Sequence, residues 1–320
     1  MLFGRVLDIN GFRMQDHILF ELTKRCHYAC KHCFTFGGSK MPEMNTEEVI
    51  SVLSKLSEAG VENVTLSGGD PALRDDLPEI VKAARDYNIV PHVFSTLLSE
   101  AQLDKIKGQV GVFATSLDGP EEIHDRIRMH AGAYKDTIRL LNLLKANSLD
   151  FAIQSMITPE SWQYIDWLIE KASEAGAYSL RLSHLAPQGR GIINNQLRID
   201  DEKMNMLFDI VEHYNKSGNG KFTLFSNLVE IEELIEKPNA YKAFTLHILP
   251  NGNALPFLGV TQWSLGNIKE HSLVSIIDNI KASGLFAKLS NIVERTYKES
   301  ISSKKRWVAY EDAMLSNLSM

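Results

Sequence analysis

The sequence predicts an α/β fold in which helices cover a mainly parallel β-sheet. Three observations predict this class: short apolar runs alternate with helical periodicity over roughly the first two-thirds of the 320 residues, the connections are short, and the alternation repeats about six times. Right-handed crossovers curl such a series into a full or partial barrel. An open doubly wound sheet satisfies the same pattern, so the sequence alone leaves both architectures open.

The first strand–helix units carry the clearest signals. A strand is expected at 18–22, directly before a loop that contains cysteines. Helix 46–59 places its apolar residues on one face, with Asn45 as its N-cap and Gly60 as its stop. The next strand, 61–66, ends at a pair of glycines. The following elements are expected as helix 77–87, strand 90–95, helix 98–106, strand 110–117, helix 134–146, strand 151–157, helix 161–175 and strand 179–185.

The pattern changes after residue 191, where the regular alternation ends. A Gly-containing segment, 217–220, is expected to break the chain. The elements expected in this region are helix 200–214, a β-hairpin formed by 244–249 and 254–255, and helices 273–280 and 285–293. We therefore expect a barrel domain over residues 1–215 and a small α+β hairpin domain over residues 216–320.

The composition is that of an ordinary soluble globular protein, with 44% hydrophobic and 23% charged residues. A formal net charge of −6 gives no overall attraction to nucleic acid or anionic lipid, and the short basic run 304–306 is expected to be a solvated tail. No stretch approaches the roughly 20 apolar residues that span a bilayer, and the N-terminus lacks the apolar run of a signal peptide. These features predict a cytoplasmic protein without nucleic-acid or membrane partners.

The chain has three cysteines, Cys26, Cys30 and Cys33, and all lie in the loop after the first expected strand. An odd and tightly clustered set is a poor disulfide framework. Three thiolates on one short loop can hold three irons of a [4Fe–4S] cluster and leave the fourth iron open to a small chelating ligand. A zinc site with His27 or His32 as fourth ligand is the alternative, although zinc ligands more often come as C-x2-C pairs across a longer loop.

The C-x3-C-x2-C segment resembles the signature of the radical S-adenosylmethionine (SAM) superfamily, and the resemblance covers roughly residues 16–190. It implies a partial, TIM-like (β/α)6 barrel with a [4Fe–4S] cluster on the three cysteines. In that family the cluster reductively cleaves SAM into methionine and a 5′-deoxyadenosyl radical, which abstracts hydrogen from the substrate. The same resemblance implies a reductant such as flavodoxin or ferredoxin.

A second motif extends the resemblance to the end of the second strand. Gly68, Gly69 and Asp70 resemble the family's Gly-Gly-Glu-Pro segment, which contacts the SAM amino group; here Asp replaces the usual Glu. Glycine suits a place where backbone approaches a ligand closely. His32 stands where the family usually has an aromatic residue near the adenine. Alone, these glycines would equally suit an ordinary strand-to-helix turn.

A third motif, Ser116-Leu-Asp118-Gly followed by Arg128, resembles the pattern of the subfamily that modifies peptides and proteins. The resemblance implies that Ser116 contacts the SAM ribose and that Arg128 lies near the SAM carboxylate, with Asp118 as part of the same cofactor-binding motif. Further expected SAM contacts are Gln154 on the fifth strand and Leu182, or alternatively Leu185, on the sixth.

The C-terminal region departs from the family pattern. Residues 249–257 and 265–268 resemble the SPASM/twitch-like hairpin domain of the peptide-modifying subfamily, but Phe257 stands where a cysteine is normal, and no cysteine follows. We therefore expect a single cluster and no auxiliary one. The chain also lacks a cysteine hydrogen donor outside the cluster motif. The hairpin domain is expected to serve shape or substrate contact.

Three functions fit these motifs. The first is modification of a ribosomally synthesised peptide; only about 15 residues precede the first expected strand, so a separate leader-peptide-binding protein or direct recognition is expected. The second is action on a small metabolite such as a sugar, nucleoside or antibiotic precursor. The third is a non-catalytic scaffold with a structural or sensing cluster. Tyr178, His184 and Arg190 lie near the expected mouth of the barrel, but the sequence assigns them no role.

Overall fold

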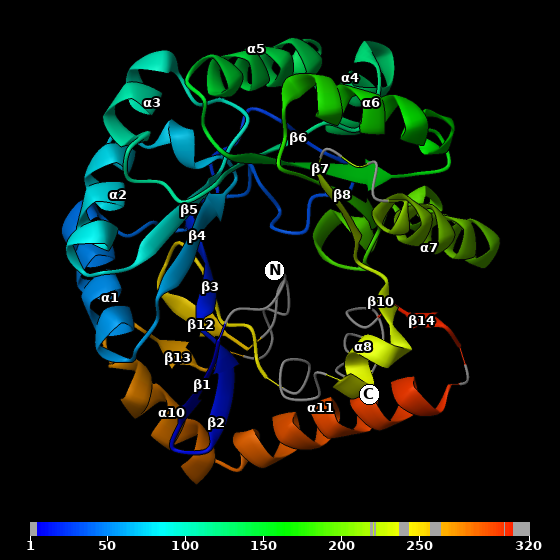
Figure 1. The fold of residues 1–320 in the computed structure, drawn as a ribbon. Coiled ribbons are helices and arrows are strands. Elements are labelled where there is room, and N and C mark those ends of the chain that lie inside the picture. Colours follow the sequence, from blue (N-terminus) through cyan, green and yellow to red (C-terminus); the bar gives the residue numbers. More distant parts are fainter. Residues whose placement is uncertain are drawn as a thin grey trace.

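The computed structural model describes residues 5–217, 220, 222–236, 243–256, 264–303 and 305–309. The architecture is α/β: one large sheet curves inside a ring of helices (Figure 1). Within the described residues, no helix is both long enough and apolar enough to cross a membrane.

The large sheet has ten strands, of which seven form the parallel centre and follow one another in chain order. From edge to edge the strands are β13 Gly266–Asn267, β12 Asn253–Leu255, β11 His247–Ile248, β3 His17–Thr23, β4 Asn63–Gly68, β5 Val90–Phe94, β6 Phe113–Ser116, β7 Phe151–Ile157, β8 Ser179–His184 and β9 Thr223–Ser226. Because β13 and β9 are its two edges, the sheet is not closed and the barrel is partial. The structure thus decides between the architectures that the sequence left open.

Helices surround the large sheet, and most of them lie on its outer face (Figure 1). They are α1 Thr46–Glu58, α2 Leu77–Asp86, α3 Glu100–Ile106, α4 Glu121–Arg128, α5 Ala133–Ala146, α6 Ile165–Ala175, α7 Asp201–Lys216, α8 Ile231–Glu236, α10 Leu273–Ala282 and α11 Leu285–Ser302. Local chemistry fixes their starts: Asn45 and Glu48 form a reciprocal capping box on α1, and Ser99 and Gln102 form another on α3.

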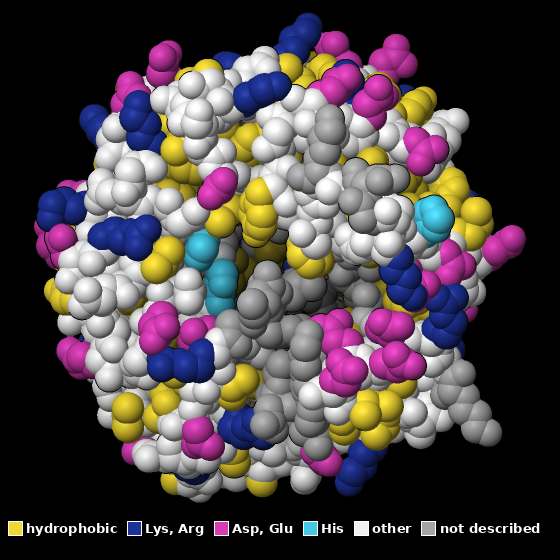
Figure 2. All heavy atoms as spheres, viewed as in Figure 1, with side chains coloured by type: hydrophobic (Ala, Val, Ile, Leu, Met, Phe, Trp, Pro, Cys, Tyr) yellow, Lys and Arg dark blue, Asp and Glu magenta, His cyan; other side chains and the backbone are white. Residues whose placement is uncertain are grey.

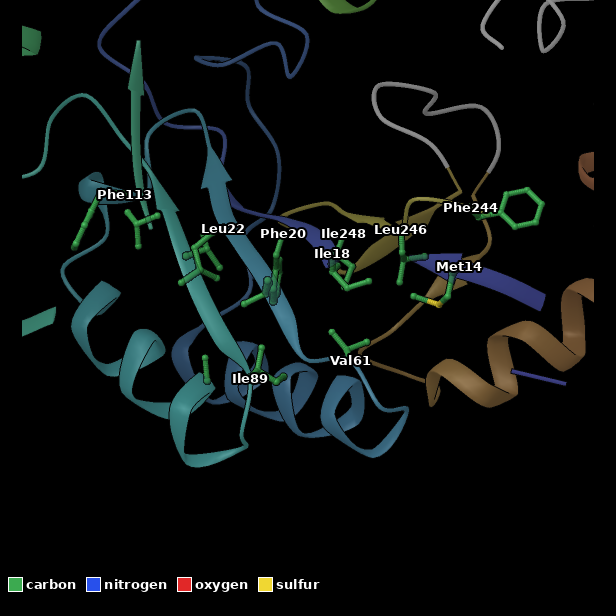
Figure 3. Packing of buried hydrophobic residues seen from close by; sticks show 14 of the residues in the cluster. Met14, Ile18, Phe20, Leu22, Val61, Ile89, Phe113, Phe244, Leu246 and Ile248 are labelled. Atoms are coloured by element: carbon green, nitrogen blue, oxygen red, sulfur yellow. The ribbon is translucent and has the colours of Figure 1, made fainter. Parts of the chain in front are cut away.

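The core lies between the sheet and these helices. Ile18, Phe20 and Leu22 alternate along β3 toward the helices, and Figure 3 shows them within the buried cluster. Each is at most 1% exposed, so each contributes about 1.5–3 kcal/mol of transfer free energy. Apolar residues on one strand face thus leave the other face for the interior of the barrel.

The expected strand–helix units are confirmed, but several boundaries differ and the structure has elements that were not expected, among them α4 and β9. The expected strand 110–117 begins only at Phe113, and the expected helix 285–293 continues as α11 to Ser302. The structure also has an N-terminal hairpin, β1 Val6–Ile9 and β2 Phe12–Gln15, before the first expected strand. Asn10 and Gly11 form its two-residue loop with φ of 53° and 84°, a left-handed pair that favours a type I′ turn.

The C-terminal hairpin belongs to the large sheet. β11 pairs in parallel with β3 and antiparallel with β12, so residues far apart in sequence form one surface. The division at residue 215 therefore stays a prediction, and Phe257 lies outside the described residues.

The short basic run near the C-terminus is not simply a solvated tail. Arg306 forms ion pairs with Asp209 and Glu212 of α7, at 2.8 and 2.7 Å. Directly after it, β14 Trp307–Val308 pairs antiparallel with β10 Val229–Glu230. Lys305 and Arg306 are exposed, as expected for a solvated run, but the ion pairs and the β10–β14 pairing show that this described part is not a tail.

Candidate active site

Loops from several strands meet at the carboxyl ends of the parallel strands, the edge at which α/β barrels bind their ligands. The Gly69 N–H donates to Thr23 O at 2.7 Å and joins the ends of β4 and β3. The Arg190 N–H donates to Cys33 O at 2.9 Å and joins the segment after β8 to the cysteine loop. In the view of Figure 1, the barrel interior is seen as a central hollow with histidine side chains at its rim (Figure 2).

The pairing register decides which side chains face the barrel interior. Ser116, Gln154 and Arg181 are paired across β6, β7 and β8, so they point to the same, inner face. Leu182 is the next residue along β8 and points the opposite way, fully buried in the hydrophobic core. The expected adenine contact from the Leu182 side chain is therefore wrong, because side chains alternate along a strand.

Each cysteine sulfur accepts a hydrogen bond. The Tyr28 N–H donates to Cys26 Sγ at 3.4 Å, and the Gly37 N–H donates to Cys33 Sγ at 3.3 Å. Arg128 Nη1 lies 3.9 Å from Cys30 Sγ and donates to it. Such donors stabilise thiolates, which are the form that binds metal.

Without metal, the thiols of Cys26 and Cys30 favour their protonated form. Burial, followed by the nearby negative groups, raises the pKa of Cys26 to about 11, and burial also raises the pKa of Cys30. Metal binding would therefore release protons from this loop.

The donor set fits a [4Fe–4S] cluster, in which each thiolate binds a different iron. Among the described residues, no three His, Cys, Asp or Glu side chains gather closely enough to hold a single metal ion. Two further groups suit a bound ligand: His32 Nδ1 and Arg190 Nη2 are buried and have no hydrogen-bond partner.

Gly68 and Gly69 permit close contact between two backbone segments. A Cβ on Gly68, whose φ is 144°, would lie 2.2 Å from Thr23 O, and a Cβ on Gly69 would lie 2.1 Å from Arg25 O. Both acceptors are backbone atoms at the start of the cysteine loop. The glycines are thus required by packing against that loop, a reason that sequence reasoning did not give.

Asp70 is buried, and its carboxylate accepts hydrogen bonds from the chain itself. The donors are Ala72 N, Ser95 Oγ, Thr96 N, Thr96 Oγ1 and Leu97 N, at 2.6 to 3.2 Å. Burial raises the pKa of Asp70, and the hydrogen bonds oppose that rise. Asp70 therefore ties the end of β4 to the loop after β5.

Asp118 is fully buried and holds Arg128 with two hydrogen bonds. Arg128 Nε and Nη2 donate to its two oxygens at 2.6 and 3.0 Å, and Met156 N donates at 2.8 Å. Burial disfavours the carboxylate, but the charge of Arg128 and its hydrogen bonds outweigh burial and lower the pKa of Asp118 to about 2. The pair positions Arg128 against Cys30.

Two histidines beside this pair are neutral. The Asp118 N–H donates to His124 Nδ1 at 3.0 Å, so that nitrogen carries no proton, and burial lowers the pKa of His124 to about 4. Burial and the positive charge of Arg128 lower the pKa of His32 to about 3. A neutral, flat ring at position 32 is compatible with the expected stacking role.

Sequence reasoning missed two groups of contacts to the cysteine loop. Arg190 donates from Nε to Cys30 O at 2.7 Å and from Nη1 to Gly37 O at 2.8 Å. On the other side, Lys24 donates to Thr35 O at 2.7 Å and pairs with buried Glu21. The sequence signal for the first group was an arginine flanked by two glycines, a few residues after the end of β8. The second group depends on tertiary contacts and had no such signal.

An open pocket of about 790 Å³ lies against the outer side of the loop. Its lining includes Cys26, the exposed cations Arg25 and Lys40 of the same loop, and Leu73 in the turn after β4. The lining residues are Arg25, Cys26, His27, Gly38, Ser39, Lys40, Met41, Pro42, Glu43 and Leu73. One cysteine is thus accessible from the surface.

Comparison with known proteins places this geometry in a family context. Residues 20–172 match the family model of the radical SAM superfamily. The chain is 29% identical over 180 residues to an AdoMet-dependent heme synthase of Oleidesulfovibrio alaskensis, covering 54% of this chain and 46% of that protein. It is 25% identical over 274 residues to the PqqA peptide cyclase of Granulibacter bethesdensis, covering 78% and 72%.

The fold matches solved structures as well. Streptococcus suis SuiB bound to its precursor peptide SuiA superposes with a TM-score of 0.67 at 15% identity, covering 81% of this chain and 64% of SuiB. At this identity the likeness concerns the fold. The matched segment also spans only about half of the heme synthase.

Proposed function

The chain contains a radical SAM domain, and from this premise we propose that the protein is an enzyme that modifies a ribosomally synthesised peptide. The observation that carries the proposal is the loop after β3, where three thiols each accept a hydrogen bond at the mouth of a partial barrel. The similarity to a PqqA peptide cyclase and to SuiB with its precursor peptide supports a peptide substrate.

Cys26, Cys30 and Cys33 would hold the cluster, and the chain has no further cysteine for a second one. We therefore propose a single [4Fe–4S] cluster. When bound together, cluster and SAM supply a 5′-deoxyadenosyl radical that abstracts a hydrogen atom from the substrate. The thiols lose their protons as they bind iron.

We propose that the SAM-binding residues fall into three groups. Ser116 and Gln154 face the barrel interior and would contact SAM directly, as would His32 through its neutral ring. Asp70 and Asp118 act through the groups that they hold. The remaining members of the proposed set are Gly68, Gly69 and Arg128.

The proposal includes partners. A separate leader-peptide-binding protein would present the peptide, and flavodoxin or ferredoxin would supply electrons. A small metabolite is the second candidate substrate, and the similarity to an AdoMet-dependent heme synthase favours it.

The test is anaerobic turnover of the reconstituted protein with SAM and a strong reductant, with and without candidate precursor peptides. We expect release of 5′-deoxyadenosine, an increase in that release with the correct peptide, and a mass change in the peptide. Cys30→Ser should abolish all three, whereas Ser217→Ala on the surface should change none. Undiminished turnover by the Cys30→Ser variant would contradict the proposal.

A further inference from the structure

The segment after β8, residues 188–194, lies across the cysteine loop, and we call it the clasp. The Arg190 backbone and guanidinium donate to Cys33 O, Cys30 O and Gly37 O at 2.7 to 2.9 Å. Asn194 Nδ2 adds a bond to Lys31 O at 3.0 Å. Four carbonyls of one loop thus accept hydrogen bonds from two residues of the clasp.

At Gly189 the backbone of the clasp is in direct contact with the backbone of the cysteine loop. Gly189 has a φ of 53°, and a Cβ there would lie 2.4 Å from Cys33 O and 2.5 Å from Phe34 O. No other residue fits this position without moving one of the two segments. The clasp and the cysteine loop are therefore held as one unit.

One nitrogen of the Arg190 guanidinium, Nη2, donates no hydrogen bond in the described part of the chain. This nitrogen is buried without a partner, which is costly for a charged group unless an acceptor is supplied. The hydrogen bonds that the guanidinium donates in the described part of the chain go to carbonyl oxygens. Arg128, by contrast, is paired with Asp118 and has its charge compensated.

We propose that Arg190 is a positioning residue for the iron–sulfur cluster: it fixes the cysteine loop through its carbonyls and places beside that loop a positive charge that no described carboxylate pairs with. The inference rests on the proposed function. Hydrogen bonds to cluster sulfurs and nearby charge set the reduction potential of such clusters. A positive charge stabilises the more negative, reduced state, so Arg190 raises the potential of the bound cluster.

The experiment compares wild type with Arg190→Gln, Arg190→Lys and the control Arg139→Gln. Arg139 is also partly buried and donates to one carbonyl, Leu98 O at 3.1 Å, which is not a carbonyl of the cysteine loop. Two readouts apply: the reduction potential of the reconstituted cluster, from an EPR-monitored redox titration without SAM, and the rate at which a thiol reagent labels the cysteines of the metal-free protein.

We expect Arg190→Gln to shift the potential to more negative values and to speed labelling about tenfold, as loss of a charge-assisted hydrogen bond predicts. Arg190→Lys keeps the charge but lacks the planar guanidinium. Its reduction potential should therefore be close to that of wild type, whereas its cysteines should be labelled as fast as those of Arg190→Gln. Arg139→Gln should match wild type in both readouts.

Two outcomes would overturn the inference: Arg190→Gln with the potential of wild type, or Arg139→Gln with the same shift as Arg190→Gln. Faster labelling with an unchanged potential would leave only a structural clasp and also counts against the proposal. If wild type itself formed no [4Fe–4S] cluster, the proposed function would fail, an outcome that the wild-type titration separates from the others.

Discussion

At the scale of single residues, the site is built from buried charges that hold one another. Asp118 and Arg128 are both almost fully buried, and their pairing makes that burial tolerable. The pair in turn places a guanidinium nitrogen 3.9 Å from Cys30 Sγ. Removing either member leaves an uncompensated charge beside the cysteine loop.

Asp118→Asn should therefore destabilise the metal-free protein by about 3 kcal/mol, because it leaves the Arg128 charge buried without its partner. The pKa of Asp118 is lowered from 3.8 to about 2 on folding. Its contribution is thus complete above pH 3.8 and is lost as the pH falls through about 2. Urea unfolding as a function of pH measures both effects. Between pH 3.8 and about 2, the free energy of unfolding should fall less steeply in the variant than in wild type.

The control for this prediction is Glu160→Gln, which breaks the exposed ion pair of Glu160 with Arg126. Exposed pairs contribute at most about 1 kcal/mol, so this variant should stay close to wild type at every pH. Equal destabilisation by the two variants would show that the buried pair has no special role.

At the scale of elements, the glycines after β4 fix how two loops meet. A Cβ on Gly69 would lie 2.1 Å from a backbone oxygen, and no side-chain movement can relieve such a contact. Gly69→Ala should therefore displace the cysteine loop. We expect at least about 1–3 kcal/mol of destabilisation and a loss of most of the iron after reconstitution.

Gly108→Ala is the matched control, because no heavy atom lies within 4 Å of its added Cβ. It should be neutral or stabilise the protein by about 0.4–1 kcal/mol. Thermal unfolding and iron content of the two variants, measured side by side, test the idea. Normal iron content in Gly69→Ala would disprove the packing role of this glycine.

The sequence predicted these elements unevenly, for physical reasons. Strong local signals, such as the Asn45 cap and the apolar periodicity of α1, were enough for helices and central strands. The β1–β2 hairpin was missed although its Asn10-Gly11 turn is a local signal. The pairing of β11 with β3 could not be predicted, because partners more than 200 residues apart leave no local pattern.

The site follows the same rule. The three cysteines and their loop could be singled out from their spacing, since all three lie within eight residues. Leu182 was placed on the wrong face because strand register was unknown. Arg190 was passed over, since its role depends on contacts made more than 150 residues away.

At the scale of the whole molecule, one continuous sheet joins the cysteine loop to the C-terminal hairpin. His247 Nε2 of β11 lies 2.7 Å from Glu21 Oε1 of β3. The other carboxylate oxygen of Glu21 forms an ion pair with Lys24 at the start of the cysteine loop. The hairpin without auxiliary cysteines thus still contacts the framework that carries the cluster loop. This arrangement is consistent with a structural use of the C-terminal region.

The central claim is that three thiolates hold one [4Fe–4S] cluster whose fourth iron is open to SAM. The most direct test is EPR spectroscopy of the reduced, anaerobically reconstituted protein before and after SAM is added, together with iron and sulfide analysis. We predict about four irons and four sulfides per chain and a spectrum that changes on SAM addition. A protein that assembles no such cluster, or a cluster whose spectrum ignores SAM, would contradict the account.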